Sequence, residues 1–416
     1  PLLAAAASSG AQQGVRWPAD IVWNSTTDPG PDLSPPQPRC GPTGATRCSR
    51  DSMPLGSGRV GVNAWVDPQG LALYFGTNHL TEYHSLIKRG RVELALTPNP
   101  FGSPKFFEQR LSLRHATLYV TARSPDHGEV RIRVFVDAVT DVVHVEVNSP
   151  QPIAANVSLG LWRRNRTLSA QEVSAKEYGD CGPAYDHADV VEPAAPDRPE
   201  IAWHRRNNRS ESVFARSLHQ QLLPELIPEL SDPITEATLG GVIVGDGSFE
   251  RVPVAPPPGG VGTRARLATT APQTQLSFAV LAHSTSTGSQ QDWTHGARKA
   301  ARAAIADGGS GWGTRHVPAW EQRWRRSWIV VAGPPGSEGA NATQANAVGR
   351  YIDLSQGLGP YPIHVSVRYS LRSDDRRRSF SNLKTVSLSQ FDGGLFSVDY
   401  PGNPDPDFHA WGGEYA

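Results

Sequence analysis

Acidic and aromatic side chains are densest in the last part of the chain, residues 391–416. They include Asp392, Asp399, Asp405, Asp407, Trp411 and Glu414. Enzymes that hydrolyse glycosidic bonds use two carboxyl groups at a defined separation, and sugars stack on aromatic rings through their apolar C–H surfaces. The composition of this segment therefore favours carbohydrate chemistry, but a loop containing Pro and Gly with solvated acids explains the same residues equally well.

A second aromatic grouping is a stripe of three tryptophans. Trp320, Trp324 and Trp328 are four residues apart, so they fall on one side of a predicted helix. Such a stripe could form a platform on which a sugar stacks. Packing into a core is the commoner role of a helical aromatic stripe, and we prefer it here.

The remaining residue groupings give weaker functional signals. His79 and His84 flank Glu82, but one such spacing in a loop, without an HExxH motif, does not define a metal site. Residues 259–264 (GGVGTR) lack the GK[ST] ending of a phosphate loop, and no Ser/His/Asp arrangement stands out. No CxxC pair is present either. We therefore expect no metal and no cofactor.

Bulk composition describes a globular chain with room for two domains. Its 416 residues carry 40 basic and 40 acidic side chains, so the net charge is zero. A balanced charge does not favour a polyanion such as nucleic acid as the main partner. No stretch approaches the roughly 20 apolar residues of a membrane span. We therefore expect neither nucleic acid nor a membrane as a partner.

Several features are typical of a secreted glycoprotein. Residues 1–9 (PLLAAAASS) resemble the end of a signal peptide, and extracellular location is the expectation that follows. Cys40 and Cys48 bracket a short loop and could close a disulfide, which leaves Cys181 to pair elsewhere or stay free. N-glycosylation sequons occur at Asn24, Asn156, Asn165, Asn208 and Asn341.

The main part of the chain has the pattern of a mainly β protein. Short β-branched runs alternate with turn signals, and ten or so strands predict a large sandwich. Within residues 130–138, Ile132, Val134 and Val136 share the expected core face. The predicted strands are residues 60–66, 71–75, 92–97, 117–122, 130–138, 142–148, 201–205, 239–244, 264–269 and 275–282. Arg131, Arg133 and Phe135 share the opposite face, which we expect to meet solvent because the arginines require water.

After the β region the pattern becomes helical. Residues 292–307 are rich in Ala and lack Pro, and residues 318–329 open with Pro at a first helical position. A linker at residues 333–340 separates them from a third predicted helix at residues 343–356. The four predicted parts are an irregular lead-in at 1–50, a β-sandwich at 51–290, a helical linker at 291–330 and a further part at 331–416.

Five sequence blocks, taken in order, carry a resemblance to a known family. They are residues 51–65 (DSMPLGSGRVGVNAW), 89–101 (RGRVELALTPNPF), 232–244 (DPITEATLGGVIV), 320–329 (WEQRWRRSWI) and 391–416, which contain GGLFSVD and WGGEY. In these blocks the chain resembles a family of secreted proteins of the six-hairpin glycosidase superfamily, near the alpha-L-fucosidase-type enzymes. No single block is specific, but their joint order is.

The resemblance implies a fold and a location for the active site. The fold is an N-terminal β super-sandwich, then a helical linker, then the truncated start of an α/α six-hairpin barrel. Asp399, Trp411 and Glu414 are implied to line the substrate pocket, whereas the general acid and base are implied to lie beyond Ala416. Asp392 stands where the resemblance implies an amide residue.

One segment departs from the pattern of the family. The resemblance implies that a YPI-like segment, here residues 361–363, runs almost directly into the block that starts at Phe391. In this chain a basic, Ser-rich stretch separates them, and so long a loop is uncommon in a compact domain. Our hypothesis is that residues 365–390 are a translated, unspliced intron. Sequencing the mature transcript and finding the insert intact would reject this hypothesis.

The function implied is that of a secreted glycoside hydrolase acting on a poly- or oligosaccharide. This chain would be its N-terminal portion and would be inactive because it lacks the acid and base. Two alternatives stay open, a glycan-binding β-sandwich without chemistry and a polysaccharide lyase. A lyase needs a base beside a uronic acid and an Arg or Lys that neutralises its carboxylate. Carbohydrate is the expected partner in all three cases.

Overall fold

The computed structural model describes most of residues 19–356 and two short segments that follow. The described residues are 19–26, 52–77, 88–125, 128–167, 185–194, 199–207, 214–232, 235–255, 257, 262–286, 288–307, 309–326, 329–356, 364–365 and 391–392. Of the predicted lead-in at residues 1–50, only residues 19–26 fall within these ranges.

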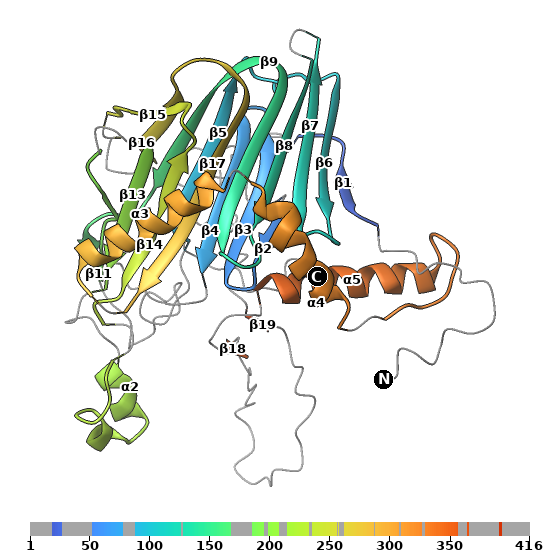
Figure 1. Cartoon of the computed structure of the whole chain (residues 1–416). Coiled ribbons are helices and arrows are strands. Elements are labelled where there is room, and N and C mark those ends of the chain that lie inside the picture. The colour runs from blue at the N-terminus through green and yellow to red at the C-terminus, as the bar shows by residue number, and fades with distance from the viewer. Residues whose placement is uncertain are drawn as a thin grey trace, which may run out of the picture.

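Fifteen strands form one connected sheet that folds into two packed layers (Figure 1). One layer has the order β1-β6-β7-β8-β9-β17-β14-β13-β12, and the other has β2-β3-β4-β5-β9-β16-β15. The strands are β1 (Ile21–Trp23), β2 (Met53–Gly56), β3 (Val60–Asp67), β4 (Gly70–Thr77), β5 (Gly90–Thr97), β6 (Phe106–Ser112), β7 (Thr117–Ser124), β8 (Gly128–Val136), β9 (Val142–Leu161), β12 (Val190–Val191), β13 (Glu200–Arg206), β14 (Thr238–Gly245), β15 (Phe249–Val252), β16 (Gly262–Thr269) and β17 (Gln273–Thr285). Two short pairs, β10 (Arg166–Thr167) with β11 (Tyr185–Asp186) and β18 (His364–Val365) with β19 (Phe391–Asp392), form separate sheets. The predicted class, mainly β with helices after the sandwich, is confirmed.

Strand β9 belongs to both layers and joins them. Its first half, as far as Asn148, pairs with β8 and β17, and β17 also meets Ile153; its second half, from Ala154, pairs with β5 and β16. Between the halves lie Pro150 and Pro152, which are exposed and have no N–H to give to a ladder. The chain therefore leaves one layer here and enters the other, so a single strand of 20 residues closes the sandwich.

The core fills the space between the two layers. Phe75 and Trp203 meet edge to face with ring centroids 5.8 Å apart, and the Trp203 indole N–H donates to the Arg89 carbonyl at 2.7 Å. A Cβ on Gly241 would lie 2.8 Å from the Trp203 ring, so this packing requires glycine there. Alternating residues of the strands fill the rest, among them Val92, Leu94, Leu96, Ile132, Val134 and Val136.

All ten predicted strands are present, and the differences lie at their ends and between them. The strand predicted at residues 130–138 ends at Val136, and the one predicted at 142–148 continues to Leu161. Five strands of the sandwich were not predicted, namely β1, β2, β6, β12 and β15. Strand β1 corrects the expectation of an irregular lead-in, because Ile21, Val22 and Trp23 pair antiparallel with β6.

The outer face of β8 differs from the prediction at one residue. Arg131 is exposed as expected, but Phe135 is fully buried. The Phe135 ring stacks on His144 with centroids 4.8 Å apart and lies 5.0 Å from the ring of His316. The helical segment that follows the sandwich therefore covers this end of the face, which a strand pattern alone does not reveal.

Helices follow the sandwich and lie against it (Figure 1). They are α3 (Gln290–Ala306), the π-helical turn η6 (Trp312–His316), α4 (Val317–Trp324) and α5 (Glu338–Gln356), and a short α2 (Phe214–Gln220) with the 3₁₀ turn η4 (Pro224–Leu226) precedes β14. Ser289 and Asp292 cap α3 reciprocally. Its buried Trp293, Ala297 and Ala301 pack on the outer face of β14 and β17.

Helix α3 matches its prediction, whereas the next two helices differ in their bounds. The helix predicted at residues 318–329 ends at Trp324. The linker predicted at 333–340 is shorter, because α5 begins at Glu338 rather than at Thr343. Helix α5 shares the core of the sandwich through Tyr351, whose hydroxyl donates to the Pro54 carbonyl at 2.7 Å.

Candidate functional site

The predicted pocket residues lie outside the part of the chain that the structure describes. These are Asp399, Trp411 and Glu414, and the same holds for Cys40, Cys48, Cys181, His79, Glu82 and His84. The pocket and the disulfide therefore remain predictions. Asp392 is described as part of β19, where it pairs with His364 of β18.

Four of the five sequon asparagines are described. Asn24, Asn165 and Asn341 are exposed, and Asn156 is half-buried within β9, between Ala95 and Ala268 of its neighbours. The fifth, Asn208, lies outside the described residues. Exposure is what attachment of a glycan requires, so the first three are the better acceptors.

The tryptophan stripe packs into the core, as preferred from the sequence. Trp320 and Trp324 are 0% and 1% exposed. The Trp324 indole N–H donates to the Leu113 carbonyl at 3.0 Å, and the Trp320 ring stacks on Tyr351 of α5. Trp328 lies outside the described residues. The two described tryptophans therefore join linker and sandwich and are not a platform for a sugar.

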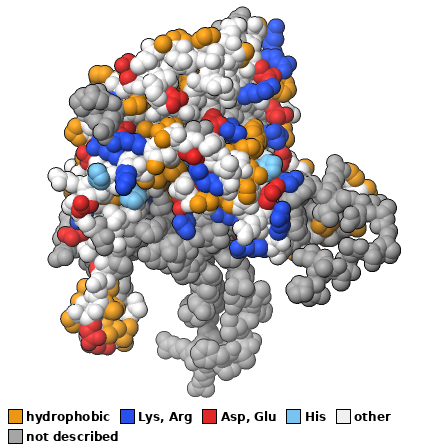
Figure 2. All heavy atoms as spheres, in the orientation of Figure 1, with side chains coloured by type: hydrophobic (Ala, Val, Ile, Leu, Met, Phe, Trp, Pro, Cys, Tyr) orange, Lys and Arg blue, Asp and Glu red, His pale blue; other side chains and the backbone are white. Residues whose placement is uncertain are grey.

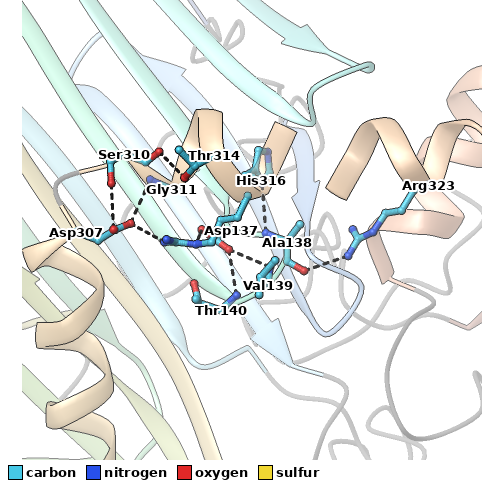
Figure 3. Close-up of polar contacts among 11 residues, drawn as sticks. Asp137, Ala138, Val139, Thr140, Asp307, Ser310, Gly311, Thr314, His316 and Arg323 are labelled. Carbon is cyan, nitrogen blue, oxygen red and sulfur yellow. Dashed lines mark hydrogen bonds and ion pairs between the residues drawn. The ribbon is translucent and has the colours of Figure 1, made fainter. Parts of the chain in front are cut away.

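A network of buried polar groups joins the end of β8 to the linker (Figure 3). Asp137 is fully buried, and its Oδ1 accepts from the backbone N–H groups of Val139 and Thr140 at 2.9 and 3.0 Å. Its Oδ2 accepts from Arg315 Nε at 2.7 Å, and Arg315 also pairs with Asp307 at 2.7 Å. Both oxygens of Asp137 are thus engaged, so this carboxylate holds structure together and is not placed to transfer a proton to a substrate.

His316 occupies the centre of the same network in its neutral form. Its Nδ1 accepts from the Ala138 backbone N–H at 3.2 Å, which places the ring proton on Nε2, 2.7 Å from the His115 carbonyl. Burial lowers the pKa of His316 to about 4, and burial likewise lowers the pKa of His144 to about 4. Arg323 completes the junction by donating to the carbonyls of Ser57 and Ala138 at 2.7 and 3.2 Å.

A surface hollow of about 610 Å³ lies between α3 and the edge of the sandwich. Its carboxylates Glu192 and Glu200 are the obvious candidates for acid and base. Glu200 is 1% exposed, and Arg302 and Arg298 hold its two oxygens at 2.6 and 2.9 Å. Glu192 faces His204 at 3.1 Å and accepts from Gln290 at 3.0 Å. These contacts dock α3 onto β13, so the hollow is explained by packing.

A second hollow, about 500 Å³, is lined by aromatic and ionisable side chains, and we call it the Trp312 hollow. It combines aromatic rings with acidic and basic side chains from the residue before β1, from β6, β7 and the turn between them, and from η6. Its lining includes Asp20, Arg110, Arg114, His115, Tyr119 and Trp312. None of these residues was singled out by the sequence patterns, because they come from segments far apart in the chain.

Three contacts fix the orientation of Trp312. Its indole N–H donates to the Thr117 hydroxyl at 2.9 Å, and the Arg133 guanidinium carbon lies 4.7 Å from its ring centroid. Arg133 is itself held by Glu146, with Nε 2.7 Å from the carboxylate. The His115 ring stands at 83° to the indole. The half-buried Trp312 is therefore a rigid aromatic wall of the hollow.

The charges of the Trp312 hollow are balanced. Asp20 pairs with Arg110 at 2.8 Å, and Arg114 pairs with Glu321 of α4 at 2.8 Å. Burial and the neighbouring Arg114 lower the pKa of His115, so its ring is neutral at pH 7. The hollow thus presents hydrogen-bond donors and acceptors in fixed positions without a large net charge.

On the face that α3 crosses, the basic, acidic and apolar side chains of the described residues are interspersed (Figure 2). Among the residues that the structure describes, no three His, Cys, Asp or Glu side chains converge as a metal site. Within the same residues, no helix is long and apolar enough to cross a membrane.

Comparison with protein families gives one match, to the domain of unknown function DUF5703, over residues 43–329. The match covers every strand of the sandwich except β1, and the linker through α4. The chain belongs to the DUF5703 family. One family model spans both parts of this DUF5703 chain, in agreement with the core that its sandwich and linker share.

No curated protein matches this DUF5703 chain. Among solved structures, a putative kojibiose phosphorylase from human microbiome is 11% identical with a TM-score of 0.37, covering 74% of this chain and 37% of its own. A bacterial glucoamylase complexed with acarbose is 6% identical with a TM-score of 0.36, covering 81% of this chain and 44% of its own. The chain spans less than half the length of either protein, and likeness at this level does not establish a shared fold.

Proposed function

We propose that this chain is the N-terminal portion of a secreted glycoside hydrolase that acts on a poly- or oligosaccharide. The observation that carries the proposal is the order of its parts. A two-layer sandwich comes first, and the α3–α4 linker docks on it. Helix α5 follows the linker in the chain and packs against the sandwich as well. This is the order that the sequence resemblance implies for a sandwich in front of a helical catalytic barrel. Function is inferred here by analogy of architecture, so it requires a direct test.

Within this proposal the sandwich gives the barrel a fixed starting point. Helix α5 is held at three places, by the Tyr351 hydroxyl on Pro54, by the ring stack on Trp320 and by the Ser355 carbonyl, which accepts from Gly58 N at 2.9 Å. A Cβ on Gly56 would lie 2.1 Å from the Ser355 carbonyl oxygen, so this close approach requires glycine. The sandwich therefore fixes the position of the C-terminal end of α5.

Hydrolysis of a glycosidic bond needs one carboxyl group as acid and a second as base or nucleophile. Among the described residues, Asp137 and Glu200 are buried carboxylates with both oxygens engaged. We therefore place the acid and base outside the described residues, and keep Asp399, Trp411 and Glu414 as proposed pocket residues.

Pairing of β18 with β19 supports the proposed insert at residues 365–390. His364 lies opposite Asp392, and Val365 lies opposite Phe391. The chain thus enters and leaves the intervening segment at neighbouring points, as an insertion requires. The extracellular location of the protein and the attachment of glycans at its sequons are part of the same proposed function.

Product analysis distinguishes the proposed hydrolase from its two alternatives. The protein is incubated with neutral polysaccharides and with uronate polymers, and new reducing ends and unsaturated products are measured. We expect new reducing ends without unsaturated products from the protein encoded by the complete transcript, and no turnover from the chain that ends at Ala416. Unsaturated products from uronate polymers would instead establish a lyase. Binding without turnover by both proteins would establish the glycan-binding alternative.

A further inference from the structure

We propose that the Trp312 hollow is a binding site for a neutral pyranose oligosaccharide. The inference rests on the proposed function in one respect, since both require a carbohydrate partner. It adds a site at the junction of sandwich and linker, built from Asp20, Arg110, Tyr119 and Trp312.

Size and rigidity are the first argument. About 500 Å³ falls within the usual range of small-ligand pockets. Trp312 is oriented by Thr117 on its edge and by Arg133 on its ring, so little conformational freedom is lost when a ligand binds. Tyr119 is ordered similarly, with the Arg110 guanidinium carbon 4.6 Å from its ring centroid.

The chemistry of the lining is the second argument. An aromatic ring has a negative face, and the C–H groups on one side of a pyranose are apolar and slightly positive, so the two surfaces attract. Sugar hydroxyls both donate and accept hydrogen bonds. Asp20 supplies an acceptor next to Arg110, which supplies donors, and burial raises the pKa of Tyr119, whose hydroxyl therefore stays protonated.

Charge balance decides the class of glycan. A uronate or sulfated polymer requires a cation that is not already neutralised. Arg110 and Arg114 line the hollow, but each forms an ion pair at 2.8 Å, with Asp20 and Glu321 respectively. An acidic sugar would have to compete with these carboxylates, so the hollow favours a neutral oligosaccharide.

The position of the hollow connects it to the helical part of the chain. Ala19 and Gln344 of α5 are joined by two hydrogen bonds, from Ala19 N to the amide oxygen at 2.8 Å and from the amide nitrogen to Ala19 O at 2.9 Å. These bonds fix the residue next to Asp20. The hollow therefore lies between the sandwich and the linker, and the residue next to its Asp20 is bonded to α5.

Substitution of Trp312 tests the inference in the full chain. Titration with gluco-, manno-, galacto- and xylo-oligosaccharides is compared for the wild type, Trp312→Ala and Phe106→Ala. We expect the wild type to bind at least one neutral class and Trp312→Ala to bind it about tenfold more weakly or worse. Phe106 is a 40% exposed aromatic on β6 that does not line the hollow, so Phe106→Ala should bind as the wild type does.

A spectroscopic measurement covers the case in which Trp312→Ala does not fold. Wild-type protein is labelled with 5-fluorotryptophan, and the Trp312 resonance is assigned with Trp312→Phe. Saturation with the oligosaccharide should shift this resonance. Neutral glycan binding that leaves both the resonance and the affinity of Trp312→Ala unchanged would overturn the inference and leave the proposed function standing. Binding of uronate polymers alone, or of no glycan, would also overturn it, and only the last result would count against the proposed function as well.

Discussion

Acidification from pH 6.5 to pH 4 is expected to destabilise the junction of sandwich and linker strongly. Burial lowers the pKa of His144 and of His316 to about 4, whereas an unfolded histidine has a pKa near 6.5. Between these values the unfolded chain takes up protons that the folded chain does not. Stability therefore falls as pH drops through this interval, by roughly 3 kcal/mol for each histidine, and these two groups add nothing above pH 6.5.

The geometry explains why these histidines resist protonation. A proton on His316 Nδ1 would face the N–H of Ala138, so protonation removes this hydrogen bond and adds an unsolvated charge. His144 is 3% exposed and lies flat on Phe135. Its protonation would place a cation among buried groups near the Arg315 guanidinium, although Asp137 offsets part of this cost.

Replacement of His144 by Phe isolates one of the two contributions. The substitution keeps a flat ring on Phe135 and removes the titrating group. Denaturant unfolding of the full chain is measured at pH 7, 5.5 and 4 for the wild type, His144→Phe and His295→Gln, the last on an exposed histidine of α3. We expect His144→Phe to lose roughly 3 kcal/mol less than the wild type between pH 6.5 and 4. If the unfolding free energies of the wild type and His144→Phe changed in parallel with pH, His144 would not be buried in its neutral form.

Truncation of Trp324 to Ala is expected to cost about 3–5 kcal/mol of unfolding free energy. The indole is 1% exposed, so its removal leaves a cavity between α4 and the sandwich. It also leaves the Leu113 carbonyl without the indole donor, which adds to the cost. Since Trp324, Trp320 and Tyr351 belong to one core, loosening α4 should also loosen α5.

Two matched variants make the Trp324 measurement specific. Trp324→Phe keeps most of the volume and loses the hydrogen bond, so we expect a smaller loss of about 1–3 kcal/mol. Arg325→Ala, at the next residue, removes a side chain that is 80% exposed and should change stability by less than about 0.5 kcal/mol. Urea unfolding checks all three. A cost for Trp324→Ala as small as that for Arg325→Ala would mean that α4 does not dock on the sandwich.

Strand prediction from sequence succeeded where one face of a strand is buried. The alternation of Ile132, Val134 and Val136 identifies the core face of β8 directly, because burial imposes a period of two. The continuation of β9 was missed, because Pro150 and Pro152 indicate a break in any single sheet. The structure uses the two prolines as the point where one strand passes between two layers, which is a property of the tertiary fold.

Strand β6 and the neutral histidines were missed for a related reason. Gln109 is 1% exposed in the middle of β6, where its amide oxygen accepts from Val66 N at 3.1 Å. A buried polar residue weakens the apolar alternation on which prediction depends. Likewise, nothing in the sequence near His144 or His316 indicates burial, since each is buried by the other's segment.

Prediction of a functional site succeeded least. The residues favoured by the sequence, Asp399, Trp411 and Glu414, lie outside the described part of the chain. The Trp312 hollow depends on pairing of β1 with β6 and on docking of η6 against β7. Asp20 and Trp312 are brought together by these tertiary contacts alone, and local patterns carry no signal for such a site.

Glycan-array binding of the full chain at neutral pH tests the central claim, that the partner of this protein is a carbohydrate, most directly. We predict retention on one or more neutral oligosaccharides, with no comparable retention on nucleic acid, because the net charge is zero and the guanidinium groups of the Trp312 hollow are already paired. Absence of binding to every glycan by a chain with an intact cooperative unfolding transition would contradict the account.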